Sequence, residues 1–265
     1  MICDRCVSML RSLAIVISAL LVIGAISHSV CAQAERLKAY GVLIDNTRSL
    51  EKRFDQVKLF SKRVVDQAHT RGPVQLFNFK WTRDTSYFVM RRFPERSEGG
   101  NYDRAIASLG VDWTQDESIL TRYVEGIDLV RGQTDLFGAI RSVAESLNDS
   151  PGNSKDATSD KIIILITDGD HRMEMIGTSQ PTETNDERRR RDGNLRKYLK
   201  DSSIKVYAIG ITGELDTGSQ GGGDSPRLRA ENFLSRVTRE TGGKVVFSRS
   251  KHAEIEELVS QLLGP

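Results

Sequence analysis

Three short segments of the sequence carry side-chain oxygens at spacings that suit a hard divalent cation. The first is the segment 45–49 (DNTRS), in which Asp45, Thr47 and Ser49 place a carboxylate and two hydroxyls at alternating positions. Alternate residues of a segment that leaves a strand can point to one side, so these three side chains can reach one ligand. Taken alone, the segment is equally compatible with a helix N-cap at Ser49.

The second and third segments each add one oxygen ligand. Thr134 stands in the sequence GQTD before a predicted helix that begins near Leu136, and Asp168 follows the apolar run 161–167. Simpler interpretations exist here too, because Thr and Asp are common helix N-caps and Asp-Gly is a common turn. Together the three segments offer only oxygen donors, which are the ligands that Mg²⁺ prefers.

The elements that must position these residues alternate between apolar strands and amphipathic helices. The predicted strands are 38–45, 74–81, 85–93, 161–167, 204–211 and 244–247. The predicted helices are 49–69, 117–128, 136–147, 182–199, 230–240 and 252–263. The segment 94–112 is expected to begin as a loop, and 213–224 is expected to be a loop throughout.

This alternation predicts an α/β fold of the Rossmann-like kind, with a doubly wound, mainly parallel central sheet and helices on both faces. The continuous β-branched run 161–167 is typical of a central strand that is buried on both sides. Ligands of such sheets bind beyond the carboxyl ends of the strands. We therefore expect the functional site in the loops that follow the strands.

The three segments together resemble the von Willebrand factor type A (VWA) domain and its metal-ion-dependent adhesion site (MIDAS). The pattern of that family is D-x-S-x-S after the first strand, a Thr in a middle loop and an Asp after a later strand. Here Asp45, Thr47 and Ser49 match the first part, with Thr in place of the first Ser. Thr134 and Asp168 match the other two parts. The resemblance extends over residues 38–263 and is strongest to exported, single-domain bacterial proteins.

The resemblance implies a metal site and a mode of binding. The five matching residues would hold Mg²⁺, or Mn²⁺ or Ca²⁺, with Asp45 and Asp168 acting directly or through water. A site with few directly bound carboxylates leaves positive charge on the cation. The cation can then accept a carboxylate from another protein as its last ligand, so the expected function is metal-bridged recognition of an acidic group on a protein partner.

Arg48 departs from the family pattern, which usually has a small residue at this position. If its side chain points inward, its charge repels the cation and weakens metal binding. If it points outward, it can bind the incoming carboxylate. Asp135 and Asp170 add negative charge nearby that offsets the charge of Arg48.

The N-terminal segment has the features of a secretory signal peptide. Arg5 and Arg11 flank the start, residues 13–26 are apolar or small, and an A-x-A sequence ends at Ala34. We expect cleavage after Ala34, or alternatively after Ala32, which leaves residues 35–265 as an exported VWA domain in the periplasm or outside the cell. The alternative is an uncleaved anchor, but the apolar run is short for a membrane span.

Two further features limit what the exported chain can do. All three cysteines, at positions 3, 6 and 31, lie in the predicted signal peptide, so the mature chain forms neither a disulfide nor a thiolate metal site. The 38 basic and 36 acidic residues give a net charge of +2, which argues against nucleic acid as a partner. The basic run 187–192 (ERRRRD) is therefore predicted to be a solvated helix face. We also expect no insertion of the mature chain into a membrane.

Enzymatic function is not expected. The arrangement of Asp45 and Thr47 after a strand is faintly similar to haloacid-dehalogenase-type phosphatases, but those enzymes have an acidic residue where Thr47 stands. The sequence also lacks a recognisable set of nucleophile, base and orienting residue. The remaining alternative is a VWA-like fold whose metal site is degenerate and which binds partners through its surface alone.

Overall fold

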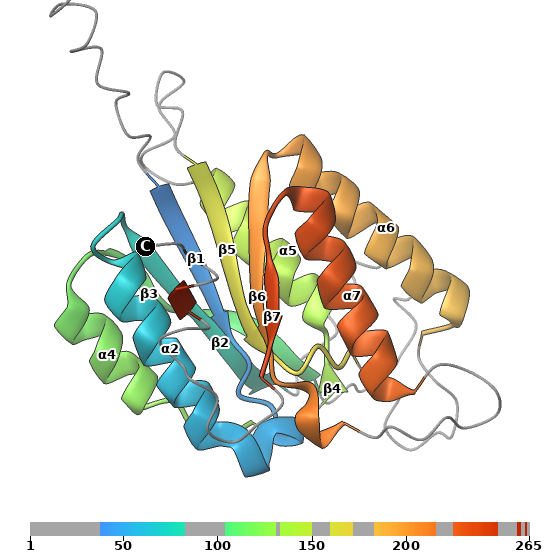
Figure 1. The fold of residues 1–265 in the computed structure, drawn as a ribbon, viewed down its shortest axis with the longest axis horizontal. Helices are drawn as coiled ribbons and strands as arrows, with labels where there is room; N and C mark the ends of the chain where they lie inside the picture. The colour runs from blue at the N-terminus through green and yellow to red at the C-terminus, as the bar shows by residue number, and fades with distance from the viewer. Residues whose placement is uncertain are drawn as a thin grey trace, which may run out of the picture. The chain divides into compact units, whose positions relative to one another are not determined.

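Seven strands among the described residues form one sheet in the order β4-β3-β2-β1-β5-β6-β7 (Figure 1). The computed structural model describes residues 38–82, 104–130, 133–149, 160–171, 183–215, 225–248, 259–260 and 263. These residues belong to one unit, Leu37–Pro265. Within the sheet only β2 and β3 pair in the antiparallel sense. The predicted doubly wound, mainly parallel α/β class is confirmed.

The strands are β1 (Lys38–Ile44), β2 (Val74–Thr82), β3 (Arg104–Thr114), β4 (Gln133–Thr134), β5 (Asp160–Thr167), β6 (Ile204–Gly210) and β7 (Val245–Phe247). The α-helices are α2 (Phe54–Ala68), α4 (Glu117–Glu125), α5 (Leu136–Asn148), α6 (Asn185–Asp201) and α7 (Pro226–Thr241). Two short 3₁₀ helices, η1 (Arg48–Arg53) and η3 (Thr212–Glu214), follow β1 and β6.

Helices cover both faces of the sheet, as the apolar pattern of the central strands requires. Leu43 and Ile163 pack with α5, α6 and α7, whereas their neighbours Val42 and Ile164 pack with α2 and α4 on the opposite face. Side chains of successive strand residues point to opposite faces, so a strand buried on both sides must be apolar throughout. This explains the continuous run that forms β5. The parallel strands all end at one edge of the sheet, which therefore gathers the loops that follow them (Figure 1).

The second strand pair differs from the prediction. β2 pairs with β3, for which the sequence predicts no strand because the segment 94–112 is expected only to begin as a loop. The predicted strand 85–93 lies outside the described residues. β3 is antiparallel and lies next to the short edge strand β4, and its Leu109 side chain is 45 % exposed. A strand in this position needs no continuous apolar run, so the pattern that identifies β1 and β5 is missing.

The chain ends are described only in part. The predicted signal peptide 1–34 and most of the predicted helix 252–263 lie outside the described residues, and residues 259, 260 and 263 are helical. The predicted loop 213–224 begins with η3, and the single helix predicted for 49–69 is divided into η1 and α2. In the part of the chain that is described, no helix is long and apolar enough to span a membrane.

Candidate metal centre

The loop after β1 brings its three oxygen-bearing side chains together. Asp45 is fully buried, and its Oδ1 accepts hydrogen bonds from the backbone N–H of Thr47 at 3.0 Å and from the Thr47 hydroxyl at 2.7 Å. The hydroxyls of Thr47 and Ser49 are 3.1 Å apart. The alternating side chains therefore share one side of the loop, and Ser49 lies at its exposed end.

The loop after β5 places a second carboxylate beside the first. β1 and β5 are parallel neighbours, with Ile44 opposite Ile166, so Asp45 and Asp168 leave the same edge of the sheet. Asp168 is 2 % exposed, and its Oδ1 accepts a hydrogen bond from the backbone N–H of Asp170 at 2.8 Å. Its Oδ2 is buried and has no hydrogen-bond partner in the described structure.

The two carboxylates destabilise each other's charge. Burial, together with the negative charges of Asp45 and Asp170, raises the pKa of Asp168 to about 8. Burial also raises the pKa of Asp45, although hydrogen bonds from Thr167 and Thr47 act in the opposite direction. No Lys or Arg of the described ranges lies within ion-pair distance of either group. A bound divalent cation would supply the missing positive charge.

Thr134, the fifth candidate ligand, lies at the same edge of the sheet. Its side chain is buried, and its backbone pairs with Ala105 near the start of β3, which itself lies opposite the end of β2. The segment that leads to Thr134 is bound to the first loop, because the carbonyl of Asn46 accepts a hydrogen bond from the N–H of Val130 at 2.8 Å. The three predicted segments therefore meet at one edge. Coordination by Thr134 itself stays a prediction.

Two residues that hold this edge together were not singled out from the sequence. The Asn46 side chain accepts a hydrogen bond from the N–H of Phe79 at 2.8 Å and donates one to the carbonyl of Asp128 at 2.6 Å, so it links the loop after β1 to strand β2 and to the segment after α4. The Thr167 hydroxyl donates to Oδ2 of Asp45 at 2.6 Å. In the sequence, the only feature that points to Asn46 and Thr167 is their position, because each is adjacent to one of the two candidate carboxylates.

Arg48 points away from the two carboxylates. Its side chain is 64 % exposed, and its Nε lies 3.3 Å from a carboxylate oxygen of Glu51, one turn further along η1. The alternative in which Arg48 points inward and repels a cation is therefore wrong. The outward alternative, contact with an incoming carboxylate, is compatible with this exposure.

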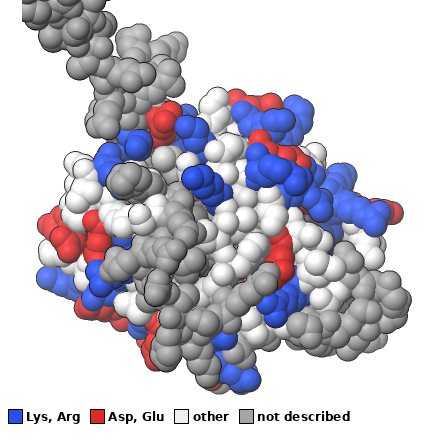
Figure 2. Space-filling view, in the orientation of Figure 1, with Lys and Arg blue, Asp and Glu red and all other residues white. Residues whose placement is uncertain are grey.

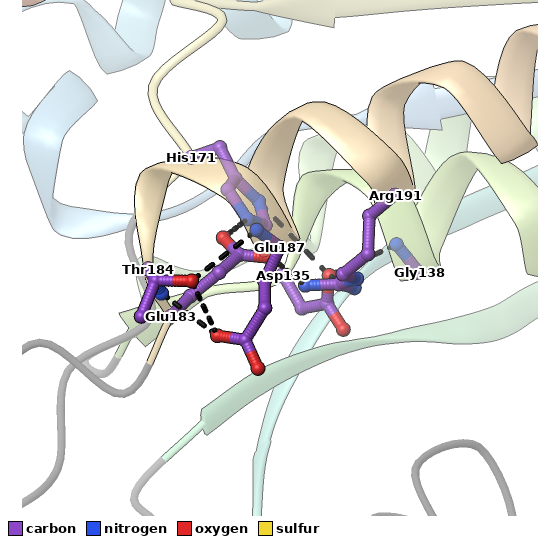
Figure 3. A network of polar contacts seen from close by, with 7 residues as sticks. All are labelled: Asp135, Gly138, His171, Glu183, Thr184, Glu187 and Arg191. Carbon is purple, nitrogen blue, oxygen red and sulfur yellow. Dashed lines mark hydrogen bonds and ion pairs between the residues drawn. The ribbon is translucent and has the colours of Figure 1, made fainter.

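A second polar cluster lies next to the Thr134 and Asp168 loops and consists of Asp135, His171, Glu183 and Arg191 (Figure 3). The predicted solvated face of the basic run 187–192 is wrong for Arg191, whose side chain is only 13 % exposed because it pairs with two buried carboxylates. Arg189 and Arg190 are exposed, and basic side chains gather with acidic ones over α6 in Figure 2.

The charges in this cluster compensate one another. Burial alone would raise the pKa of Asp135, but Arg191, His171 and the N–H of Gly138 together lower it to about 2. The pKa of Glu183 is also lowered, because His171 and Arg191 outweigh the effect of its burial. The described residues contain no group of three or more His, Cys, Asp and Glu side chains arranged to hold a metal. The candidate centre is of a different kind, with two carboxylates and neutral hydroxyls.

The fold is similar to that of several proteins of known structure, although no protein-family model and no curated protein matches the sequence. Proximal thread matrix protein 1 from the mussel byssus is 17 % identical, with a TM-score of 0.51, and the match covers 85 % of this chain and 46 % of that one. The pilus adhesin SpaC from Lactobacillus rhamnosus GG is 15 % identical, with a TM-score of 0.51 and coverages of 86 % and 31 %.

A third similar structure contains three N-terminal domains of the type V pili tip protein Mfa5 from Porphyromonas gingivalis. It is 12 % identical, with a TM-score of 0.51, and the match covers 83 % of this chain and 49 % of that one. This chain thus spans less than half the length of each of the three structures. The likeness establishes a VWA-like fold, as the sequence resemblance implied. At such identities it establishes the fold alone.

Proposed function

We propose that this chain is a binding module that holds a divalent cation and uses it to recognise an acidic group on a protein partner. The proposed ligands are Asp45, Thr47, Ser49, Thr134 and Asp168, and the proposed cation is Mg²⁺, with Mn²⁺ or Ca²⁺ as substitutes. The two pilus proteins with a similar fold are named as an adhesin and a tip protein, which favours a role in binding over one in catalysis.

The observation that carries this proposal is the pair of buried carboxylates with which no basic side chain of the described residues forms an ion pair. Asp45 and Asp168 repel each other, and Oδ2 of Asp168 is a buried acceptor that no described donor reaches. A buried unpaired carboxylate is costly unless a cation or a hydrogen bond compensates it. The side-chain atoms of the proposed ligands are all oxygens, and they fit Mg²⁺ better than a softer metal.

The charge balance of the site also suggests what the cation would bind. Where Asp45 or Asp168 acts through water, few carboxylates bind the +2 ion directly, and the three neutral hydroxyls leave positive charge at its outer face. A carboxylate from a partner can complete the coordination there, and the exposed Arg48 is within the same loop. Because Arg48 points outward, the main reason to regard the metal site as degenerate is removed.

We further propose that residues 1–34 are a signal peptide and that 35–265 form an exported VWA domain of the single-domain bacterial type. The apolar run 13–26 and the A-x-A sequence that ends at Ala34 support export. The mature domain would act in the periplasm or outside the cell. Full-length protein expressed with its leader, followed by N-terminal sequencing of the product, tests cleavage after Ala34 against cleavage after Ala32 and against retention.

A thermal unfolding experiment tests the metal site. An ion that binds only the folded protein stabilises it by RT ln(1 + [L]/Kd), which is about 2.7 kcal/mol at 100 times Kd. We expect Mg²⁺ or Mn²⁺ to raise the Tm of the native protein relative to EDTA, and to leave the Tm of Asp45→Ala and Asp168→Asn unchanged. The matched control is Asp192→Asn, which removes another buried carboxylate, one in the middle of α6 that binds Arg196 of the same helix and Arg236 of α7.

The control should lose stability but keep the response to Mg²⁺. An equal response in native protein and Asp45→Ala would reject the site. Recognition of an acidic group is tested separately by capture of partners from envelope extract with Mg²⁺ or with EDTA. Asp168→Asn serves as the negative control, and a captured partner whose acidic residues can all be replaced without loss would reject the proposed mode of binding.

A further inference from the structure

The polar cluster of Asp135, His171, Glu183 and Arg191 is built as a continuous chain of charged contacts (Figure 3). Nη2 of Arg191 lies 2.6 Å from Oδ1 of Asp135, and Nη1 lies 2.8 Å from Oε1 of Glu183. The other oxygen of Glu183 lies 2.7 Å from Nε2 of His171. Each arm of the guanidinium therefore holds a different carboxylate, and Glu183 links the guanidinium to the imidazole.

The members of this chain come from segments that are far apart in the sequence. Asp135 is the N-cap of α5, His171 belongs to the loop after β5, Glu183 precedes the N-cap of α6, and Arg191 lies within α6. The His171 ring also stacks on Phe137 of α5, with centroids 4.0 Å apart and planes at 11°. The start of α5 is thus bound to the loop after β5 in three ways: by stacking, by the approach of Nδ1 of His171 to Oδ1 of Asp135 at 4.0 Å, and through Glu183 and Arg191.

Two members of the chain adjoin proposed metal ligands. Asp135 directly follows Thr134, and His171 stands three residues after Asp168. The contacts therefore join the loop that carries the Thr134 hydroxyl to the loop that carries the Asp168 carboxylate. Asn46 provides a comparable link between the first loop and the segment before Thr134, but within the described residues it forms no hydrogen bond with the loop after β5.

Helix capping does not account for the whole cluster. Oδ1 of Asp135 caps α5 by accepting a hydrogen bond from the N–H of Gly138 at 2.9 Å, and this bond does not require Arg191. The side chains of Asp135, Glu183 and Arg191 are only 2 %, 5 % and 13 % exposed. Burial of these charged groups carries a large desolvation cost. Apolar residues of similar volume often stabilise a fold as well or better, so a buried network of this kind is better explained by what it positions.

We infer that Arg191, held by Asp135 and Glu183, is a positioning residue that sets the spacing between the Thr134 loop and the Asp168 loop of the metal centre. This inference rests on the proposed function, since it assigns the cluster a role in metal binding. Arg191 itself does not contact the cation. Its loss lets the Thr134 loop move relative to the Asp168 loop, so the cation keeps its carboxylates but loses a correctly placed hydroxyl.

The test is a set of Mg²⁺ titrations by calorimetry on native protein, Arg191→Met, Thr134→Val and the double variant. We expect Arg191→Met to weaken Mg²⁺ binding by about tenfold or more, the range seen when residues that orient metal ligands are removed. In the Thr134→Val background, Arg191→Met should change the Mg²⁺ affinity by less than about twofold, because the hydroxyl that Arg191 positions is already absent.

Arg196→Met is the matched control for this experiment. It removes a second ion-paired arginine of the same helix, one that binds Asp192 and Glu240 instead of the loops at the metal centre. It should lower the Tm without changing the affinity for Mg²⁺. Equal Mg²⁺ affinities of Arg191→Met and native protein would overturn the inference. So would an equal loss of Mg²⁺ affinity on Arg191→Met in the native protein and in the Thr134→Val variant.

Arg191→Lys covers the case in which Arg191→Met does not fold. A lysine keeps the charge but cannot reach two carboxylates in the two-armed geometry of a guanidinium, so its Mg²⁺ affinity should also fall. Native affinity in a folded Arg191→Lys protein would then overturn the inference. Failure of the proposed function has a different signature, because the native protein itself would then not bind Mg²⁺.

Discussion

The Thr167 hydroxyl donates a hydrogen bond to Oδ2 of Asp45 at 2.6 Å, and so joins the last residue of β5 to the first residue after β1. The same hydroxyl oxygen accepts a hydrogen bond from the N–H of Gly169 at 2.9 Å. Gly169 has a φ of 76°, a conformation that favours glycine, and its N–H is held in place by this bond. One side chain therefore orients the first candidate carboxylate and the turn that carries the second.

Replacement of Thr167 by valine should lower stability. The change keeps the shape of the side chain but leaves Oδ2 of Asp45 and the N–H of Gly169 without this partner. Loss of one partner of a buried hydrogen bond costs about 1–3 kcal/mol in the free energy of unfolding, which urea denaturation in EDTA measures. Thr167→Ser keeps the hydroxyl and is the control. A valine variant as stable as the serine variant would contradict the role given to this hydroxyl.

The metal-free protein should lose stability as the pH rises from about 4 towards 8. The pKa of Asp168 is about 8 in the folded protein against 3.8 for an ordinary Asp, so the folded state binds more protons than the unfolded state between these values. Stability falls with pH wherever the folded state binds more protons. Asp168→Asn removes this contribution, so its Tm in EDTA should vary less with pH and exceed that of native protein at pH 8. A native Tm that rises over this range would contradict the assignment.

Binding of Mg²⁺ should become stronger over the same range of pH. The cation requires an ionised Asp168 and must displace the proton that the carboxyl group holds below pH 8. We expect the affinity to rise by up to about tenfold per pH unit between pH 6 and 8, with release of about one proton. Calorimetric titration in two buffers of different ionisation enthalpy measures this release. Binding without proton release at pH 6.5 would show that Asp168 is already ionised.

The sequence predicts the fold well where the pattern is local. The continuous apolar run 161–167 and the helical spacing of apolar residues in 136–147 can each be recognised from the segment itself. Both elements appear within a residue of the predicted bounds, as β5 and α5. β3 is different because it lies between β2 and the short edge strand β4 and has an exposed Leu109, so it lacks the continuous apolar run of a strand buried on both faces. Its place depends on pairing across the sheet.

The candidate site shows the same division. The alternation of Asp45, Thr47 and Ser49 is local, and the structure does bring these side chains together. The contact of Arg191 with Asp135 joins residues 56 positions apart. It depends on how α6 packs against α5, which no local spacing encodes. A run of four arginines has the composition of a solvated surface even when one of them is buried.

Replacement of Arg48 by glycine tests the two roles considered for that residue. Since its side chain is exposed and paired with Glu51, its charge is screened by solvent, and we expect Mg²⁺ affinity to change by less than about threefold. Capture of an acidic partner in Mg²⁺ should weaken, because the guanidinium can no longer contact the incoming carboxylate. Arg48→Lys separates charge from geometry. Clearly tighter Mg²⁺ binding by Arg48→Gly would restore the repulsion hypothesis.

Two helix glycines offer a matched pair of substitutions with opposite expected effects. A Cβ atom at Gly138 of α5 would lie 2.5 Å from Oδ2 of Asp135, whereas a Cβ at Gly193 of α6 would meet no atom within 4 Å. Alanine favours a helix over glycine by about 0.5–1 kcal/mol, so Gly193→Ala should raise the free energy of unfolding by that amount.

Gly138→Ala should lower the free energy of unfolding. The new Cβ displaces the Asp135 carboxylate and so breaks the N-cap of α5, which is worth about 0.5–2 kcal/mol. It also disturbs the contact between Asp135 and Arg191. Urea denaturation measures both, and Mg²⁺ titration should show weaker binding for Gly138→Ala alone. Equal stabilisation by the two alanines would mean that Asp135 can move without consequence.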